Sequence, residues 1–351
     1  MWRVYVPLSG DEMINRIQHL IYQRIRDIKI KSVKFKSFTE YLNSYEILFS
    51  YADYKDLKER TFLYDVLDEN LTCIFCLKKA PDTVFDDNSH VIPYSIGNHF
   101  LMHREECMAC NDKFGRTIET ELANFSEKFR VINGQKNRNK KKPGYLKYQP
   151  KSQRAILQMR NIDNKLVLEV TGERPEDILK EHEAGKISLK FEADYRDAEV
   201  YKAFMKSIYG VIPPKYRKDF TILRNWINTE DYNVKLINNL MMYQTILPTF
   251  HTNNLIINVF RTKKSVRNML LRKQNFDYFA LIGFGNVLFD IPLLSDTTLT
   301  KIQNKNVKSF ILPRMSDFVF NKIGGMRNIL EMSNTEKRAE VVKFELAGER
   351  E

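Results

Sequence analysis

Four cysteines lie in two C-x-x-C pairs, Cys73 with Cys76 and Cys107 with Cys110, and the sequence contains no fifth. Sulfur ligands in this pattern are typical of a tetrahedral zinc site with a structural role. Disulfide bonds are unusual in a cytoplasmic protein, and neighbouring C-x-x-C cysteines make poor structural bridges. The cysteines therefore predict a structural Zn²⁺ site, with reduced, unliganded cysteines as the alternative.

Three of the six histidines, His90, His99 and His103, fall between the two cysteine pairs. Imidazole suits a general base because its unperturbed pKa lies near about 6.5. His90 is followed by Val91 and Ile92, whose β-branched side chains favour an extended backbone, and then by Pro93. This pattern predicts that the His90 ring is carried on a short strand beside the second cysteine pair.

The segment that runs through Cys73-Ile-Phe-Cys76, Ser89-His90-Val91-Ile92-Pro93, Gly97-Asn98 and Cys107-Met-Ala-Cys110-Asn111 resembles the HNH endonuclease superfamily. It is most similar to the members whose ββα-metal fold is stapled by four cysteines. The resemblance covers residues 73–125, so most of the chain lies outside it. It implies a metal-dependent endonuclease that hydrolyses phosphodiester bonds in nucleic acid, with DNA favoured over RNA, and a role in defence or in a mobile element is compatible with it.

The resemblance also implies roles for individual residues. His90 corresponds to the general base, and Asn111 to a ligand of the catalytic Mg²⁺ or Mn²⁺ or to a residue that orients the site. Ser89 stands where many members carry Asp or Glu, so it is a weak neutral candidate ligand, and nearby Asp86 and Asp87 could substitute for it. The middle Asn of the HNH triad corresponds to Asn98 or His103, and His103 is also a candidate metal ligand.

Other interpretations of these residues stay open. His90 could be a hydrogen-bonded structural histidine, Asn111 could cap a helix, and His99 is expected to be a surface or structural residue. A non-catalytic, zinc-containing nucleic-acid-binding protein is the alternative function, and Ser89 is the residue that favours it. A zinc nucleobase deaminase is excluded, because that chemistry requires H-x-E well upstream of P-C-x-x-C, whereas Glu106 precedes Cys107 here.

A basic segment follows the cysteine region directly. The whole chain carries a formal charge of +12, and residues 128–160 contain eleven Lys or Arg residues and no Asp or Glu. Such a segment attracts polyanions, although a solvated linker is the alternative, and Phe129, Tyr145 and Tyr148 could stack on bases. The predicted nucleic-acid contacts are Lys113, Arg116, Lys136, Arg138, Lys140, Lys141 and Lys142.

The predicted architecture is α+β, with a helical N-terminal segment over 1–68, the HNH module over 69–127, a basic linker over 128–154 and a larger α+β domain of unknown role over 155–351. Apolar positions at helical spacing predict helices over 11–29, 111–125 and 198–209, and further helices are expected within 33–68. Alternation predicts strands at 166–170 and 187–191, and apolar runs predict others at 255–260, 278–282 and 287–291.

The setting of the protein is expected to be the cytoplasm. No apolar stretch reaches the roughly 18–20 residues that span a bilayer, so no membrane association is predicted. The residues after Met1 lack the apolar core of a secretory signal. The regions that flank the module could also bind a protein partner or a second copy of the chain.

Replacing Lys140, Lys141 and Lys142 by Gln should weaken binding similarly across nucleic-acid sequences, because lysines bind phosphates rather than base edges. For duplex DNA, the slope of log K against log salt should become less negative by up to about 3, near 0.9 for each phosphate that is no longer neutralised. Binding titrations at several salt concentrations measure this slope, with Lys263 and Lys264 changed as the control. An unaltered slope would demote the segment to a linker.

Overall fold

A computed structural model of the chain describes residues 2–7, 29–31, 38–52, 59–64, 71–133, 146–148, 156–162, 165–171, 186–248, 252–263, 276–303 and 309–347. Helices and strands are both abundant in these residues, which confirms the predicted α+β class. The helix predicted over 11–29 lies almost entirely outside the described residues. Most of the basic segment also lies outside them.

A six-stranded antiparallel sheet occupies the C-terminal part of the fold. The strands predicted at 255–260, 278–282 and 287–291 are confirmed, and the last two form a hairpin that turns at Gly285 and Asn286. Gly285 has a φ of +58°, and an added Cβ would lie 2.4 Å from the Asn133 side chain, so glycine is required there. The strand order is β15 (Met326–Glu331), β10 (Met241–Ile246), β13 (Val287–Leu293), β12 (Tyr278–Gly285), β11 (Thr252–Thr262) and β3 (Tyr45–Ala52).

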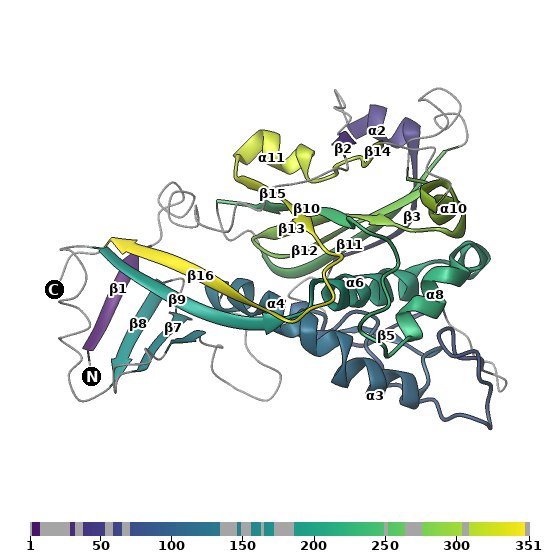
Figure 1. The fold of residues 1–351 in the computed structure, drawn as a ribbon, viewed down its shortest axis with the longest axis horizontal. Coiled ribbons are helices and arrows are strands. Elements are labelled where there is room, and N and C mark those ends of the chain that lie inside the picture. The colour runs from purple at the N-terminus through teal and green to yellow at the C-terminus, as the bar shows by residue number, and fades with distance from the viewer. Residues whose placement is uncertain are drawn as a thin grey trace.

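Helices cover both faces of this sheet (Figure 1). One face packs on α4 (Ile118–Ile132) and α6 (Asp197–Val211), through Phe125, Phe204 and Phe289, whose ring centroids lie 5.3–6.4 Å apart. The other face carries α2 (Phe38–Ser44) and α11 (Asp317–Ile323), where Tyr41 meets Phe318 edge-on. Helix α8 (Thr221–Asn228) packs on α6, and η2 (Lys218–Phe220) and α10 (Asp296–Gln303) contact α8, with α7 (Pro214–Arg217) next to η2. Among the helices of the described residues, none has the length and apolar character needed to span a bilayer.

Three smaller sheets complete the arrangement outside the cysteine region. The strands predicted at 166–170 and 187–191 are confirmed as β8 and β9. Four antiparallel strands lie in the order β1 (Trp2–Pro7), β8 (Lys165–Thr171), β7 (Ile156–Ile162) and β6 (Leu146–Tyr148). A long antiparallel ribbon joins β9 (Lys186–Tyr195) to β16 (Arg338–Ala347), and a short parallel pair joins β2 (Lys29–Lys31) to β14 (Ser309–Ile311).

The N-terminal segment differs from the expected run of helices. Within its described residues only α2 is helical, whereas β1, β2, β3 and β4 (Thr61–Leu63) are strands. In residues 45–52 every second side chain is Tyr, Ile or Phe, a pattern that suits a strand. These residues pair with β11, and the backbone hydrogen bonds between the two strands satisfy the N–H and C=O groups that face β11. For β3 the reason for the difference is its pairing with β11, a strand about 200 residues away, which the local composition of 33–68 does not reveal.

The helix predicted over 111–125 is present but interrupted. It consists of α3 (Met108–Arg116) and α4, and Thr117 breaks the regular backbone between them with φ −113° and ψ −99°. The Thr117 hydroxyl donates a hydrogen bond to the Lys113 carbonyl at 2.7 Å, which competes with the helical pattern. The apolar stripe of the prediction is nevertheless buried along its whole length, at Phe114, Ile118, Leu122 and Phe125.

Replacing Phe125 by Ala should destabilise the whole chain by about 3–5 kcal/mol, because it opens a cavity where α4, α6 and the sheet meet. Urea unfolding followed by circular dichroism and by metal release should show one transition, shifted equally in both signals. Ile222→Ala, at a side chain that is 41% exposed, is the control and should change stability by less than about 0.5 kcal/mol. Two separate transitions would contradict a shared core.

Candidate active site and metal centre

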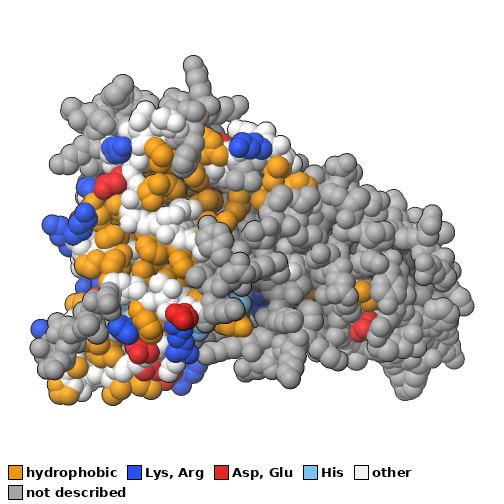
Figure 2. All heavy atoms as spheres, turned by 180° about the vertical axis from the view of Figure 1, so that it is seen from behind, with side chains coloured by type: hydrophobic (Ala, Val, Ile, Leu, Met, Phe, Trp, Pro, Cys, Tyr) orange, Lys and Arg blue, Asp and Glu red, His pale blue; other side chains and the backbone are white. Residues whose placement is uncertain are grey.

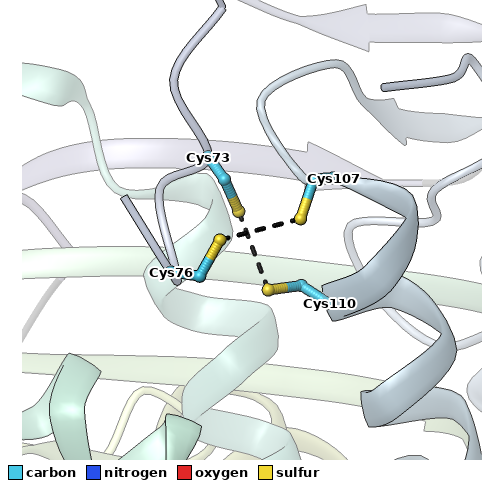
Figure 3. A group of neighbouring side chains, drawn as sticks. All are labelled: Cys73, Cys76, Cys107 and Cys110. Atoms are coloured by element: carbon cyan, nitrogen blue, oxygen red, sulfur yellow. Dashed lines mark hydrogen bonds between the residues drawn. The ribbon is translucent and has the colours of Figure 1, made fainter. Parts of the chain in front are cut away.

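The four cysteine sulfurs converge on one point (Figure 3). Their Sγ atoms all lie within 4.8 Å of one another, with Cys73 and Cys110 3.8 Å apart and Cys76 and Cys107 3.7 Å apart. A tetrahedral ion with Zn–S bonds of about 2.3 Å places its sulfurs about 3.8 Å apart, so the separations fit zinc. The cluster supports the predicted structural zinc site.

Hydrogen bonds to Cys73 favour its thiolate form, whereas burial raises the pKa of Cys76 and the hydrogen bond with Cys73 raises the pKa of Cys110. Hydrogen bonding from the Cys110 thiol, followed by backbone N–H groups of Cys107, Cys76 and Phe75, lowers the pKa of Cys73 to about 5 despite its burial. The first pair sits in a tight turn, in which the Leu77 amide donates to the Cys73 carbonyl at 2.9 Å. The second pair begins α3, with Cys107 as its N-cap residue. Metal binding would therefore tie this turn to the start of α3.

A short β-hairpin lies between the two pairs. His90 forms an antiparallel bridge with Met102, flanked by hydrogen bonds from the Val91 amide to Leu101 and from the His103 amide to Ser89. The returning arm is β5 (Leu101–His103), and β4 extends it as a parallel neighbour. Together with α3, this hairpin makes a ββα unit that carries His90 on its first arm and Asn111 on its helix.

Asn98 holds the loop of the hairpin closed. Its side-chain amide donates to the carbonyls of Ile92 at 2.7 Å and Leu101 at 2.8 Å, and its oxygen accepts from the Leu101 amide at 2.9 Å. The side chain is fully buried, so these bonds are shielded from water. The loop also contains η1 (Tyr94–Ile96) and ends in Gly97, whose φ of +101° suits glycine. Asn98, rather than His103, clamps the two arms that carry His90.

The side chains of His90 and Asn111 are both partly exposed. The centroid of the His90 ring lies 6.0 Å from that of the Tyr94 ring, in an edge-on arrangement. The exposed His99 ring stacks against Tyr94, at a centroid distance of 4.6 Å. Asn111 is the fourth residue of α3, and its amide donates to the Cys107 carbonyl. Because Cys107 holds the N-cap position, Asn111 is not the helix cap. Neither side chain is fully enclosed by the fold.

Ser89 and His103, the other candidate metal ligands, are fully buried. The Ser89 hydroxyl faces the Glu106 carbonyl at 3.5 Å, and His103 Nδ1 accepts the Glu105 amide at 2.9 Å. Burial, together with the nearby cations Arg217 and Lys206, lowers the pKa of His103 to about 3, so its ring is neutral. Both residues face the interior of the fold, and we leave them out of the proposed catalytic site.

Asp86 and Asp87, the acidic residues before the hairpin, serve the local turn. Asp86 accepts hydrogen bonds from the backbone and side-chain nitrogens of Asn88, and Asp87 forms an ion pair with Arg104 at 3.2 Å. Among the described residues, the cysteine cluster is the one group of three or more Cys, His, Asp or Glu side chains placed to share a metal ion. Neither aspartate thus joins a carboxylate cluster near His90 in the described residues.

Comparison with known families agrees with this geometry. Residues 73–126 match the family model described as HNH endonuclease. This segment resembles an HNH endonuclease module, and we call it the HNH module. The match includes both cysteine pairs, the hairpin, α3 and the first half of α4, and it indicates nuclease chemistry that depends on a metal. No curated protein and no solved structure matches the chain.

Lys113 and Arg116, two predicted nucleic-acid contacts, line an open pocket of about 540 Å³ beside the cysteines of the HNH module. The Lys113 ammonium donates to the carbonyl and the side-chain oxygen of Asn228 at 3.2 and 3.1 Å. With 3.6 residues per turn, both cations project from the side of α3 roughly opposite Asn111. A phosphate bound in this pocket would therefore be a different one from a phosphate held at Asn111.

The other predicted contacts, Lys136, Arg138 and Lys140–Lys142, lie outside the described residues, as does Tyr145. Phe129 is 3% exposed and packs on Phe284 and Phe289, so the prediction that it stacks on bases is wrong. Helix α4 continues through the start of the basic segment and turns this residue into the core. On the face drawn in Figure 2, the Lys and Arg side chains of the described residues are separated by hydrophobic and neutral ones.

A buried ionic cluster joins the HNH module to α6, and the sequence analysis did not identify it. The Lys206 ammonium lies 3.0 Å from a carboxylate oxygen of Glu106 and 3.0 Å from one of Glu119, and it donates to the His90 carbonyl at 3.1 Å. Burial alone would lower the pKa of Lys206, but the two carboxylates raise it above its usual value. Burial likewise raises the pKa of Glu106 to about 7, in spite of Lys206.

Further contacts reinforce this junction. Arg217 forms a two-pronged ion pair with Glu105 at 2.9 and 2.7 Å, and the Tyr209 hydroxyl lies 3.5 Å from the Ile74 carbonyl. The sequence gives little indication that Lys206 and its partners are buried. Lysines four residues apart on a helix, such as Lys202 and Lys206, usually mark a solvated face, but every residue of α6 is buried.

Replacing Cys107 by Ser should reduce both the folded yield and the thermal stability, because the bound metal holds the turn at 73–76 on the start of α3. Elemental analysis should find one zinc per chain in the natural protein and less in the variant. Met108→Leu, at the exposed neighbour on α3, is the control and should keep zinc and stability. Normal stability of Cys107→Ser without bound zinc would contradict a structural role for the metal.

Proposed function

We propose that this protein is a metal-dependent endonuclease that hydrolyses phosphodiester bonds in nucleic acid, with DNA as the favoured substrate. The observation that carries the proposal is the placement of His90. It stands on the hairpin arm that Asn98 clamps, within a module that matches the HNH family, and its side chain is partly exposed. A rigid, accessible imidazole is what a general base for phosphodiester hydrolysis requires.

The chemistry would proceed by attack of water on phosphorus. The His90 ring takes a proton from the attacking water, the new P–O bond forms, and the bond to the leaving oxygen breaks as that oxygen gains a proton from solvent. We assign to Asn111, through its amide oxygen, the binding of a hard divalent cation, Mg²⁺ or Mn²⁺. When bound, such a cation neutralises charge that develops on the phosphate.

The structural zinc has a separate role. Its four ligands are all sulfur, so it has no open position for water or substrate. The residues of the cluster tie the turn at 73–76 to the start of α3, and this helix carries Asn111. Zinc therefore supports the site without taking part in the reaction.

A non-cutting, zinc-containing nucleic-acid-binding protein is the second candidate. The observation that favours it is the buried hydroxyl of Ser89, at the position where an acidic metal ligand would strengthen cation binding. Under this alternative, His90 would be a structural residue of the hairpin. Tight, salt-sensitive binding of DNA and RNA that stay uncut would support it.

Replacing His90 by Ala should lower metal-dependent cleavage by about 10²- to 10⁴-fold, the usual contribution of a general base. Plasmid DNA and RNA, incubated with Mg²⁺ or Mn²⁺ and then with EDTA, provide the assay. His99→Ala is the matched control, because this exposed histidine lies on the same hairpin and should leave cleavage unchanged. Cleavage that survives His90→Ala, or that persists in EDTA, would refute the proposed mechanism.

A further inference from the structure

Lys206 contacts three separate parts of the HNH module from outside it. Its ammonium has three N–H donors, and it meets three acceptors: the His90 carbonyl on the hairpin at 3.1 Å, Glu106 beside the second cysteine pair at 3.0 Å, and Glu119 on α4 at 3.0 Å. The side chain is 1% exposed, and Glu106 is fully buried. One side chain of α6 thus joins the hairpin, the cysteine region and α4.

The bond to the His90 carbonyl acts directly on the hairpin arm. The arm that carries His90 is short and is paired with β5 by a single bridge and the two flanking hydrogen bonds of Val91 and His103. Strand pairing therefore supplies only a few of the polar contacts that hold this arm, beside those of the Asn98 side chain in the loop. A charged donor held in a fixed position by two carboxylates makes a stronger hydrogen bond than a neutral one, and it acts on the backbone of the residue that must be positioned.

Helix α6 also supports the same arm one turn further along. Gly210, four residues after Lys206, lies on the same side of the helix. A Cβ added at Gly210 would lie 3.2 Å from a Val91 methyl group and 3.5 Å from the His103 ring, so the helix backbone approaches both arms closely. The hairpin therefore rests on α6 at two points, and one of them is polar and directed at His90.

We propose that Lys206 is a positioning residue for His90. By holding the His90 carbonyl, its ammonium fixes the backbone from which the imidazole projects, and this makes a helix outside the HNH module necessary for the activity of that module. The proposal rests on the proposed function, since it assigns a partner to the general base. It does not require Lys206 to touch the nucleic acid.

Lys202 provides a matched control on the same helix. It lies one turn before Lys206, is equally buried, and forms an ion pair with Glu199 at 2.7 Å and a hydrogen bond to the Thr229 carbonyl at 3.3 Å. None of these partners belongs to the HNH module. Lys206→Met and Lys202→Met therefore each remove a buried ammonium from α6, but only the first removes the hydrogen bond to His90.

The first measurement is cleavage by the full-length chain. For folded, zinc-loaded Lys206→Met we expect kcat to fall by on the order of 10- to 100-fold with KM nearly unchanged, as expected when a catalytic group is misplaced. Lys202→Met should keep the natural kcat for each folded molecule. If Lys206→Met does not fold, Lys206→Met/Glu106→Gln replaces it, with Glu106→Gln as its reference, because the second change removes a buried charge left without its partner.

The second measurement is amide hydrogen exchange, which needs no substrate. We expect the Val91 and His103 amides to exchange at least tenfold faster in the Lys206 variant, whereas the Leu77 amide of the first cysteine turn keeps its natural rate. A merely structural role would speed exchange at all three amides, and Lys202→Met should change none of them selectively.

Two results would overturn the proposal: a natural kcat in a folded Lys206 variant, or unchanged exchange at Val91 and His103. Failure of the proposed function is distinguishable, because a natural protein that cuts neither DNA nor RNA would refute the nuclease. The exchange measurement would then still decide whether Lys206 holds this arm.

Discussion

The meeting of four cysteine sulfurs is the constraint on which the HNH module depends. Their separations of 3.7 and 3.8 Å suit one tetrahedral ion, and they join a tight turn at 73–76 to the first turn of α3. The hairpin between these points is short, and it buries the apolar side chains of Val91, Ile92, Ile96, Leu101 and Met102. Asn98 then closes the loop of the hairpin that carries His90, and Asn111 lies on α3, the helix that the cluster ties to the turn.

The module does not stand apart from the rest of the chain. Phe125 and Phe129 on α4 belong to the same aromatic core as Phe204 on α6 and Phe289 on the sheet. Helix α6 lies between the sheet and the hairpin and packs in both directions (Figure 1). A metal-stapled unit is thereby held on a larger hydrophobic core, and its stability and geometry depend on both.

The positive charges of the chain serve two purposes, the stability of the fold and the proposed binding of nucleic acid. Cations of the described residues that lie near the module are mostly engaged in the structure: Lys206 with carboxylates, Lys113 with Asn228, and Lys128 over the rings of Phe125 and Phe129. Part of the chain's net positive charge thus stabilises the fold. The proposed affinity for nucleic acid rests mainly on the segment after α4, together with Arg116 and Lys113 at the pocket beside the cysteines.

The sequence by itself determined the four-cysteine centre, the ββα module and some elements of the C-terminal half, namely α6 and strands β9, β11, β12 and β13. These depend on local spacing: C-x-x-C pairs, β-branched runs and apolar stripes such as Phe114 to Phe125. It did not determine that residues 45–52 form an edge strand on β11, that Phe129 is buried, or that Ser89 and His103 face inward. Nor did it reveal the cluster of Lys206, Glu106 and Glu119. These features arise from interactions between residues far apart in the chain. Such interactions bury charged and aromatic side chains that the local sequence alone would assign to the surface.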